Sequence, residues 1–399
     1  MSAQHDGTAR HPLRVVIVSR IYRPEPSAAS LFLGSVSDAL LEQSIEVEVL
    51  TAKPLPGQGT GSRGERVRTF PVLRDKRGYV RGYLQYMSFD IPLMFRLLFT
   101  RRPSIVFVEP PPTTGAAVRI ICAIRRIPYV YDAADIWSDA AAHATSSQAV
   151  VRVLRFIEKF AMRGAKAMVT ISQGVVERVA ALDIDTPITV TGFGADTSTF
   201  YHSDLPLKQT FIYAGTYTEL HGASILVDAF ALFTETHHGY ILQFIGNGNG
   251  QDEMVAKAHA LGVAGQVQIL ESVPADQLRP MLNSAISSLA TLDPNGGYEY
   301  AFTSKAYSSL ASGCPVIFAG PGPTIEFMRT AAEHAPVGES VDYGAEAIAE
   351  AMRNAADNPL STTERGHLAT WAAENHSMMA SARKVREVLV RTISAQGGK

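Results

Sequence analysis

Short, continuous apolar segments that alternate with helical segments constrain the fold of this chain most. They are rich in Val, Ile and Phe and do not alternate between apolar and polar residues, as is typical of parallel strands buried on both faces. Such repetition predicts doubly wound α/β units that bind ligands at the carboxyl ends of their strands. We expect strands at residues 14–19, 46–51, 104–109, 129–135, 167–172, 188–193, 211–216, 240–246, 267–271, 286–291 and 315–319.

These strands are too many for one standard sheet, and 399 residues can form two cores of about 150–200 residues each. Residues 203–208 are polar, contain a proline and lack periodicity, so a domain boundary is expected close to them. We predict a Rossmann-like domain at residues 11–200 and another at 208–375, facing each other across a cleft. A helix at 376–395 is expected to return to the first domain.

Composition excludes several classes of protein. A net charge of −2 argues against nucleic acid as a partner. The two cysteines, Cys122 and Cys314, offer neither a disulfide framework nor zinc-ligand spacing, which fits a reducing cytoplasm. The first residues form no apolar signal core, and no apolar run is long enough to span a bilayer.

Residues 303–318 predict a loop, a short helix that stops at Gly313, and a buried strand. Thr303 or Ser304 is expected to cap the helix through its hydroxyl. The positive end of the helix attracts anions and disfavours a cation, yet Lys305 lies in the first turn. A bound phosphate would resolve this conflict; the alternative is that Lys305 is a solvated surface residue.

Glycines follow the first two strands of the second half, at Gly215 and in the segment 246–250. They allow a tight turn and a close approach of the backbone to a ligand. The spacing differs from the G-x-G-x-x-G fingerprint of dinucleotide-binding proteins, and no Walker A sequence occurs. An NAD-dependent oxidoreductase is therefore the least favoured function, and ATP hydrolysis by a P-loop is disfavoured.

Several segments, in this order and at these spacings, resemble the retaining, nucleotide-sugar-dependent glycosyltransferases of GT-B architecture, which have two facing Rossmann-like domains. The resemblance is to the group 1, family 4-like branch, typified by phosphatidylinositol mannosyltransferases and by cell-wall and O-antigen sugar transferases. It runs from about residue 13 to about residue 391. It is carried by residues 14–26, 131–137, 194–200, 213–215, 246–248 and 304–317.

The resemblance implies a cytoplasmic enzyme of cell-envelope polysaccharide synthesis. It would move a sugar from a nucleoside diphosphate to a hydroxyl of a glycan, lipid-linked or small-molecule acceptor, without a cofactor or an obligatory metal. The second domain would bind the donor. The donor-binding residues carried over are Gly215, Thr216, His221, Gly246, Gly248, Ser272, Val273, Glu299, Phe302, Thr303, Ser304 and Ser308.

Lys305 and Asp135 are the catalytic candidates that the resemblance implies, and Ser27 and Ala28 are the acceptor-binding ones. Lys305 would stabilise charge on the departing diphosphate, and Asp135 would orient the acceptor or act as a weak base. The alternative for Asp135 is a helix N-cap. The alternative for His221 is a helix-start residue that binds no ligand.

The chain departs from the family where two glutamates eight residues apart are usual, at Tyr300 and Ser308. Ala134 stands where a histidine often precedes the cleft aspartate. These departures leave a non-catalytic nucleotide-sugar-binding paralogue as one alternative. A nucleotide-sugar 2-epimerase of the same architecture is another, although no carboxylate and histidine set for proton abstraction is evident.

Residues 63–102 are rich in arginine, with aromatic and apolar residues between the charges. Such a segment can lie on an anionic membrane surface, which would place the enzyme peripherally on the inner face of the cell membrane and fit a lipid-linked acceptor. The alternative is an amphipathic helix at 80–100 that packs on the sheet with its arginines outward.

Overall fold

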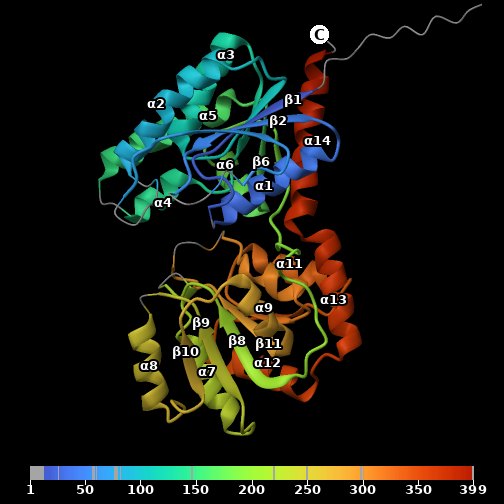
Figure 1. The fold of residues 1–399 in the computed structure, drawn as a ribbon. Helices are drawn as coiled ribbons and strands as arrows, with labels where there is room; N and C mark the ends of the chain where they lie inside the picture. The colour runs from blue at the N-terminus through green and yellow to red at the C-terminus, as the bar shows by residue number, and fades with distance from the viewer. Residues whose placement is uncertain are drawn as a thin grey trace, which may run out of the picture. The chain divides into compact units, whose positions relative to one another are not determined.

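The computed structural model describes residues 13–25, 27–55, 59, 61–75, 80, 82–144, 147–218, 221–248, 250–296, 299 and 301–397. The chain forms two compact units (Figure 1). The first comprises residues up to Ile171, Val175–Thr191 and the chain from Ala382 onward, and the second comprises Ser172–Gly174 and Gly192–Ser381. Residues 203–208 lie inside the second unit, because Phe193 and Phe200 already pack against its core.

The first unit is a parallel sheet of seven strands with helices packed against it. Its strands are β1 (Arg14–Val18), β2 (Glu46–Ala52), β3 (Arg66–Phe70), β4 (Ile105–Val108), β5 (Tyr129–Asp132), β6 (Ala167–Thr170) and β7 (Ile188–Val190). Its helices are α1 (Ala28–Leu41), α2 (Tyr83–Phe99), α3 (Pro112–Arg125), α4 (Trp137–Ala144), α5 (Gln148–Gly164), α6 (Gln173–Ala180) and the later part of α14 (Met378–Gly397).

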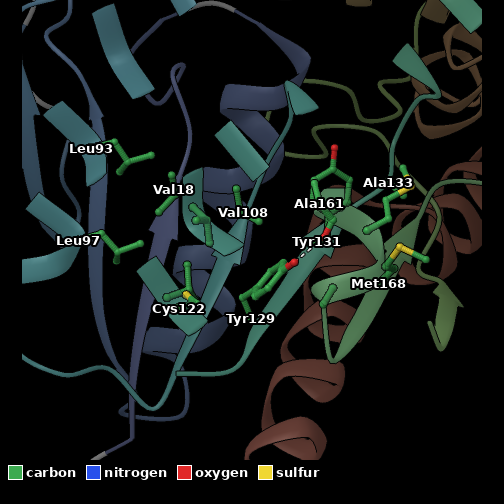
Figure 2. Close-up of a cluster of buried hydrophobic side chains, with 14 of the residues drawn as sticks. Val18, Leu93, Leu97, Val108, Cys122, Tyr129, Tyr131, Ala133, Ala161 and Met168 are labelled. Atoms are coloured by element: carbon green, nitrogen blue, oxygen red, sulfur yellow. Dashed lines mark hydrogen bonds between the residues drawn. The ribbon is translucent and has the colours of Figure 1, made fainter. Parts of the chain in front are cut away.

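One face of this sheet is covered by α2, α3 and α5, which pack side by side. Figure 2 shows Leu93 and Leu97 of α2 directed toward Val18 and Val108 of the central strands, all fully buried. The continuous apolar runs of the sequence therefore become strands whose faces are covered by helices.

The C-terminal helix α14 is tied to the end of α1 in the first unit. The Arg383 guanidinium donates to both carboxylate oxygens of Glu42, at 3.1 and 3.2 Å. Arg386 donates to the Ala39 carbonyl at 3.1 Å. These contacts hold the first half of α14 against α1.

The second unit is a six-stranded parallel sheet, again with helices packed against it. Its strands are β8 (Lys208–Ala214), β9 (Ile241–Ile245), β10 (Val267–Leu270), β11 (Ala285–Thr291), β12 (Val316–Ala319) and β13 (Gly338–Val341). Its helices are α7 (Ile225–Thr234), α8 (Gln251–Ala260), α9 (Ala275–Ser284), α10 (Lys305–Ala311), α11 (Pro323–Ala331), α12 (Ala345–Asp357) and α13 (Thr362–Asn375).

The two sheets share one strand order. The first runs β3-β2-β1-β4-β5-β6-β7 and the second β10-β9-β8-β11-β12-β13. In each, the chain moves outward on one side of the first strand and then returns to its other side, which is the doubly wound order. The predicted fold, two Rossmann-like α/β units, is confirmed. The order also creates a topological switch point between β1 and β4, and another between β8 and β11.

Two strands, β3 and β13, were not expected from the sequence. Both lie at the edge of a sheet, with one neighbour each. Their burial is correspondingly partial, and β13 reads Gly-Glu-Ser-Val, without the apolar run that marks the inner strands. Edge strands are covered on fewer sides, so their sequences need not be apolar.

Arg365 of α13 is a buried cation that joins this helix to the start of β11. Its guanidinium donates to the carbonyls of Leu282, Asn283 and Ala285 at 3.0–3.1 Å, and the residue is 2% exposed. These three carbonyls lie at the junction of α9 and β11, where the Leu282 carbonyl also accepts the Ala285 N–H, so Arg365 adds a charged donor to each of three buried backbone groups.

We predict that Arg365→Met lowers the free energy of unfolding by about 2–4 kcal/mol, because three buried carbonyls each lose a charged donor. Urea unfolding followed by circular dichroism measures the change. The matched control is Arg329→Met, which removes an exposed arginine paired with Glu326 and should leave the free energy of unfolding nearly unchanged. Equal losses in the two variants would show that Arg365 contributes no more than a surface arginine.

Candidate functional site

The predicted donor residues gather at the carboxyl edge of the second sheet. Gly215 directly follows β8, and Gly246 directly follows β9. Ser272 and Val273 lie in the loop between β10 and α9, and Lys305 begins α10 after β11. Since the strands are parallel, the loops that follow them share one edge, and this edge includes the switch point between β8 and β11.

Lys305 lies across the turn that follows β8. Its Nζ donates to the hydroxyl of Tyr213 at 2.6 Å and stands 4.0 Å from the centroid of the Tyr213 ring. The Tyr213 hydroxyl in turn donates to the Thr216 carbonyl at 2.7 Å. A Cβ on Gly215 would stand 3.2 Å from Lys305 Cε, and Gly215 has φ +139°. The structure thus brings together three residues predicted to meet the diphosphate.

The charge on Lys305 is poorly compensated. Burial lowers its pKa to about 7, and no carboxylate in the described residues counters that shift. The pKa of His221 is lowered to about 4, mainly by burial and then by the charge of Lys305. His221 Nδ1 shares a hydrogen bond with Thr218 Oγ1 at 2.9 Å. An anion placed here would raise both pKa values, because it favours the charged forms.

The glycines of the β8 and β9 loops are required for close backbone packing. A Cβ on Gly246 would stand 2.1 Å from the Gly215 carbonyl oxygen, and one on Gly248 would stand 2.0 Å from the Tyr217 carbonyl oxygen. The Tyr217 hydroxyl donates to the Gly246 carbonyl at 2.8 Å. Loop packing therefore explains these glycines by itself, and their contact with a nucleotide stays a prediction.

The start of α10 differs from expectation. Ser304 occupies the N-cap position, but its hydroxyl makes no capping hydrogen bond, so a Ser304 cap is wrong. The cause is its helical backbone conformation, φ −61° and ψ −21°, where a side-chain cap needs an extended one. Thr303 is buried, and its N–H donates to Thr324 Oγ1 at 3.0 Å.

The remaining donor candidates differ in exposure. Phe302 stacks on Tyr307 with ring centroids 4.8 Å apart and packs against the core, so interior packing explains it. Ser272 and Glu299 are exposed, and Val273 and Ser308 are half-buried. Tyr300, the other position where the family usually has a glutamate, lies outside the described residues.

The first unit carries polar groups at its own switch point. Ser19, just after β1, donates through Oγ to the Glu109 carboxylate at 2.9 Å, and Glu109 directly follows β4. Burial raises the pKa of Glu109 to about 7, although the charge of Arg20 and the Ser19 hydrogen bond oppose the shift. Sequence reasoning missed Glu109. A carboxylate directly after a buried strand beside the first strand was the available signal.

Arg20 is the buried cation of this cluster. Its guanidinium donates to the Val80 carbonyl at 2.8 Å and to the Pro110 carbonyl at 3.4 Å. It also lies 4.4 Å from the centroid of the Tyr86 ring and 5.8 Å from that of Trp137. Carbonyls and aromatic faces thus fix a positive charge next to Glu109.

Asp135 is exposed and follows β5. Desolvation by the surrounding protein raises its pKa. Asp132 is buried, and its pKa is raised by burial and by the negative charges of Glu109 and Asp135. Glu158 accepts the N–H groups of Trp137 and Ser138, at 2.7 and 3.2 Å. Glu158 therefore takes the N-terminal cap of α4 that was the alternative role for Asp135.

The predicted acceptor residues start α1. Ser27 is its N-cap, and its Oγ accepts the Ser30 N–H at 3.1 Å. Ala28 is the first helical residue and is exposed. The structure gives Ser27 a capping role, and acceptor binding by this pair remains a prediction.

The described residues contain neither a candidate metal site nor a candidate membrane-spanning helix. No group of three or more His, Cys, Asp or Glu side chains there is arranged to hold a metal ion. Within the same residues, no helix is both long and apolar enough to cross a bilayer. Metal independence stays a prediction.

Family models match both units. The model "Glycosyl transferase 4-like domain" matches residues 29–194, and the model "Glycosyl transferases group 1" matches residues 202–385. No curated protein sequence matches the chain significantly.

Solved structures with little sequence identity share the fold. Sucrose-phosphate synthase from Thermosynechococcus elongatus has a TM-score of 0.71 at 14% identity, covering 96% of this chain and 100% of its own. Anabaena HepE in complex with UDP has a TM-score of 0.68 at 15% identity, covering 95% of this chain and 100% of its own. WaaG, a glycosyltransferase involved in lipopolysaccharide biosynthesis, has a TM-score of 0.64 at 14% identity, with coverages of 94% and 99%.

These matches and the two doubly wound units agree. The two family models match the chain in the order of its units, and together they cover residues 29–194 and 202–385. The protein belongs to the glycosyltransferase group 1 family, with the GT-B fold.

Proposed function

We propose that this protein transfers a sugar from a nucleoside-diphosphate sugar to a hydroxyl of a glycan, lipid-linked or small-molecule acceptor, with retention of anomeric configuration. The observation that carries the proposal is Lys305, a cation held across the Gly215–Thr216 turn at the switch point of the second sheet. Its lowered pKa means that the free site keeps a positive charge at a cost, which a diphosphate would remove.

The bound molecules of related structures support a sugar nucleotide as donor. HepE was solved with UDP and with UDP-glucose. We therefore place the diphosphate beside Lys305 and His221, and the nucleoside along the β9 and β10 loops, where Gly246, Gly248 and Ser272 lie. Glu299 and Ser308 stay candidates for the ribose and sugar hydroxyls.

The proposed transfer breaks the bond between the anomeric carbon and the diphosphate oxygen, which takes both electrons. The acceptor hydroxyl oxygen forms the new bond on the same face, and its proton passes to the departing phosphate. Negative charge grows on the diphosphate during the step, so Lys305 contributes most in the transition state. No protein nucleophile takes part.

The first unit would bind the acceptor. Asp135 is exposed at the carboxyl edge of its sheet and can accept a hydrogen bond from an acceptor hydroxyl. Glu109 and Ser19 add a second polar pair there. A role in cell-envelope polysaccharide synthesis and a peripheral membrane contact through residues 63–102 are part of the proposal. WaaG, named for lipopolysaccharide biosynthesis, supports the former.

We predict that UDP binding takes up about one proton per molecule at about pH 8, because Lys305 is mostly neutral when free and charged when bound. Above its free pKa the affinity should then fall about tenfold for each unit of pH. Isothermal titration calorimetry in buffers of different ionisation enthalpy counts the protons.

The variant Lys305→Gln should bind UDP without proton uptake at the same pH. Lys208→Gln is the matched control, since Lys208 is exposed at the opposite end of β8. Equal proton uptake by the wild-type protein and Lys305→Gln would remove Lys305 from the phosphate site.

We further predict that Lys305→Gln lowers kcat/KM by about 10²–10³-fold, while Lys208→Gln leaves it within about twofold. Nucleotide release from a panel of sugar nucleotides and acceptors measures the rates, and proton NMR of the first-formed product reports its anomeric configuration. An inverted product would contradict retention.

Conversion of a sugar nucleotide into its C2 epimer in the absence of an acceptor would support an epimerase instead. Binding of UDP with neither transfer nor hydrolysis would support a non-catalytic paralogue.

A further inference from the structure

The outward face of α2, α3 and α5 is unusually apolar for a surface. Among the described residues, ten of the nineteen large apolar side chains that are exposed lie on these three helices. Phe99 is 80% exposed, Phe156 71% and Ile124 65%. The ten are Tyr83, Leu84, Ile91, Phe95, Phe99, Ile120, Ile124, Val150, Val153 and Phe156; we call them the apolar face.

The apolar face forms stripes on adjacent helices. Leu84, Ile91 and Phe95 recur at helical spacing on α2, as do Ile120 and Ile124 on α3. Since α3 packs against both α2 and α5, the three helices that carry the stripes are neighbours (Figure 1). The inner sides of these helices already fill the core (Figure 2), so the outward stripes contribute nothing to it. Contiguous exposed apolar surface of this kind marks an interaction site.

The charge on these helices has one sign at the surface. All of their residues are described, and the only carboxylates among them are Asp90 and Glu158, both buried. Against these stand seven Lys or Arg residues, of which Arg152 and Arg163 are exposed. Two others are paired with acids from neighbouring segments: Arg155 with Asp139 at 3.7 Å and Lys159 with Asp183 at 3.6 Å.

A basic groove adjoins the apolar face at the end of α3. It has a volume of about 880 Å³, and its lining includes Arg119, Arg126, Lys166 and Arg391 but no carboxylate. Ala123 also lines it, and the next residue, Ile124, belongs to the apolar face. The cationic surface therefore continues beyond the three helices, although the whole chain has a net charge of −2.

We propose that this face docks on an anionic lipid bilayer, with the apolar face entering the headgroup region and the surrounding cations meeting lipid phosphates. A bilayer offers apolar depth and dense negative charge together. A second copy of the chain fits less well, because a twofold interface would bring the same cations face to face. The surface reaches well beyond residues 63–102, since α3 and α5 supply half of the apolar face.

Vesicle flotation of the full chain tests the proposal. We expect it to bind vesicles of phosphatidylcholine with phosphatidylglycerol and to bind pure phosphatidylcholine vesicles far less. The variant Phe95→Gln, Phe99→Gln, Phe156→Gln should weaken binding about tenfold or more, as apolar insertion is lost. The variant Arg126→Gln, Arg152→Gln, Arg163→Gln should weaken it comparably and reduce its salt dependence.

The matched control is Val255→Gln, Leu261→Gln, Ile325→Gln, which removes exposed apolar side chains of the second unit and should leave binding unchanged. Circular dichroism melting verifies folding, and Phe99→Gln alone serves if the triple variant unfolds. The proposal is overturned if the wild-type protein does not bind anionic vesicles, or if the two triple variants of the apolar face and its cations float with the vesicles as fully as the wild-type protein. It is also overturned if they change only the oligomeric state in light scattering.

Discussion

Parallel pairing of the strands is the constraint on which both units depend. It sends every strand's carboxyl end to one edge of its sheet, so residues far apart in the chain meet there. In the second unit, β8 pairs with β11, and this pairing joins Tyr213 at the end of β8 to Lys305, which follows β11. In the first unit, β1 pairs with β4, and Ser19 meets Glu109 in the same way.

At the carboxyl edge of the second sheet, Lys305 has no described carboxylate to balance its charge. The β8 and β9 loops pack closely where Gly246 approaches the Gly215 carbonyl, and Lys305 lies against the same turn. A lysine held by a tyrosine hydroxyl and ring, and by no described carboxylate, keeps its charge only at a cost. An anionic ligand is the missing partner that would favour the charged form.

The fold was largely predictable, because the inner strands carry continuous apolar runs. The edge strands β3 and β13 were not predicted, because a strand at the edge of a sheet does not need a continuous apolar run. At the site, the predicted meeting of Gly215, Thr216 and Lys305 rests on a family resemblance, and the structure places them together. Sequence alone could not show that Phe302 stacks on Tyr307 against the core, nor that Glu158 of the next helix, α5, caps α4. Both depend on where the folded backbone places these side chains, which no local sequence pattern reports.

The most direct measurement of the central claim, a nucleoside-diphosphate site that includes Lys305, is a thermal-shift panel with UDP, GDP, ADP, dTDP and NAD. A ligand that binds only the folded state adds about 2.7 kcal/mol at a hundredfold excess over its Kd. The account predicts a clear upward shift of Tm with at least one diphosphate, and a much smaller shift in Lys305→Ala. No shift with any diphosphate, or a shift with NAD alone, would contradict it.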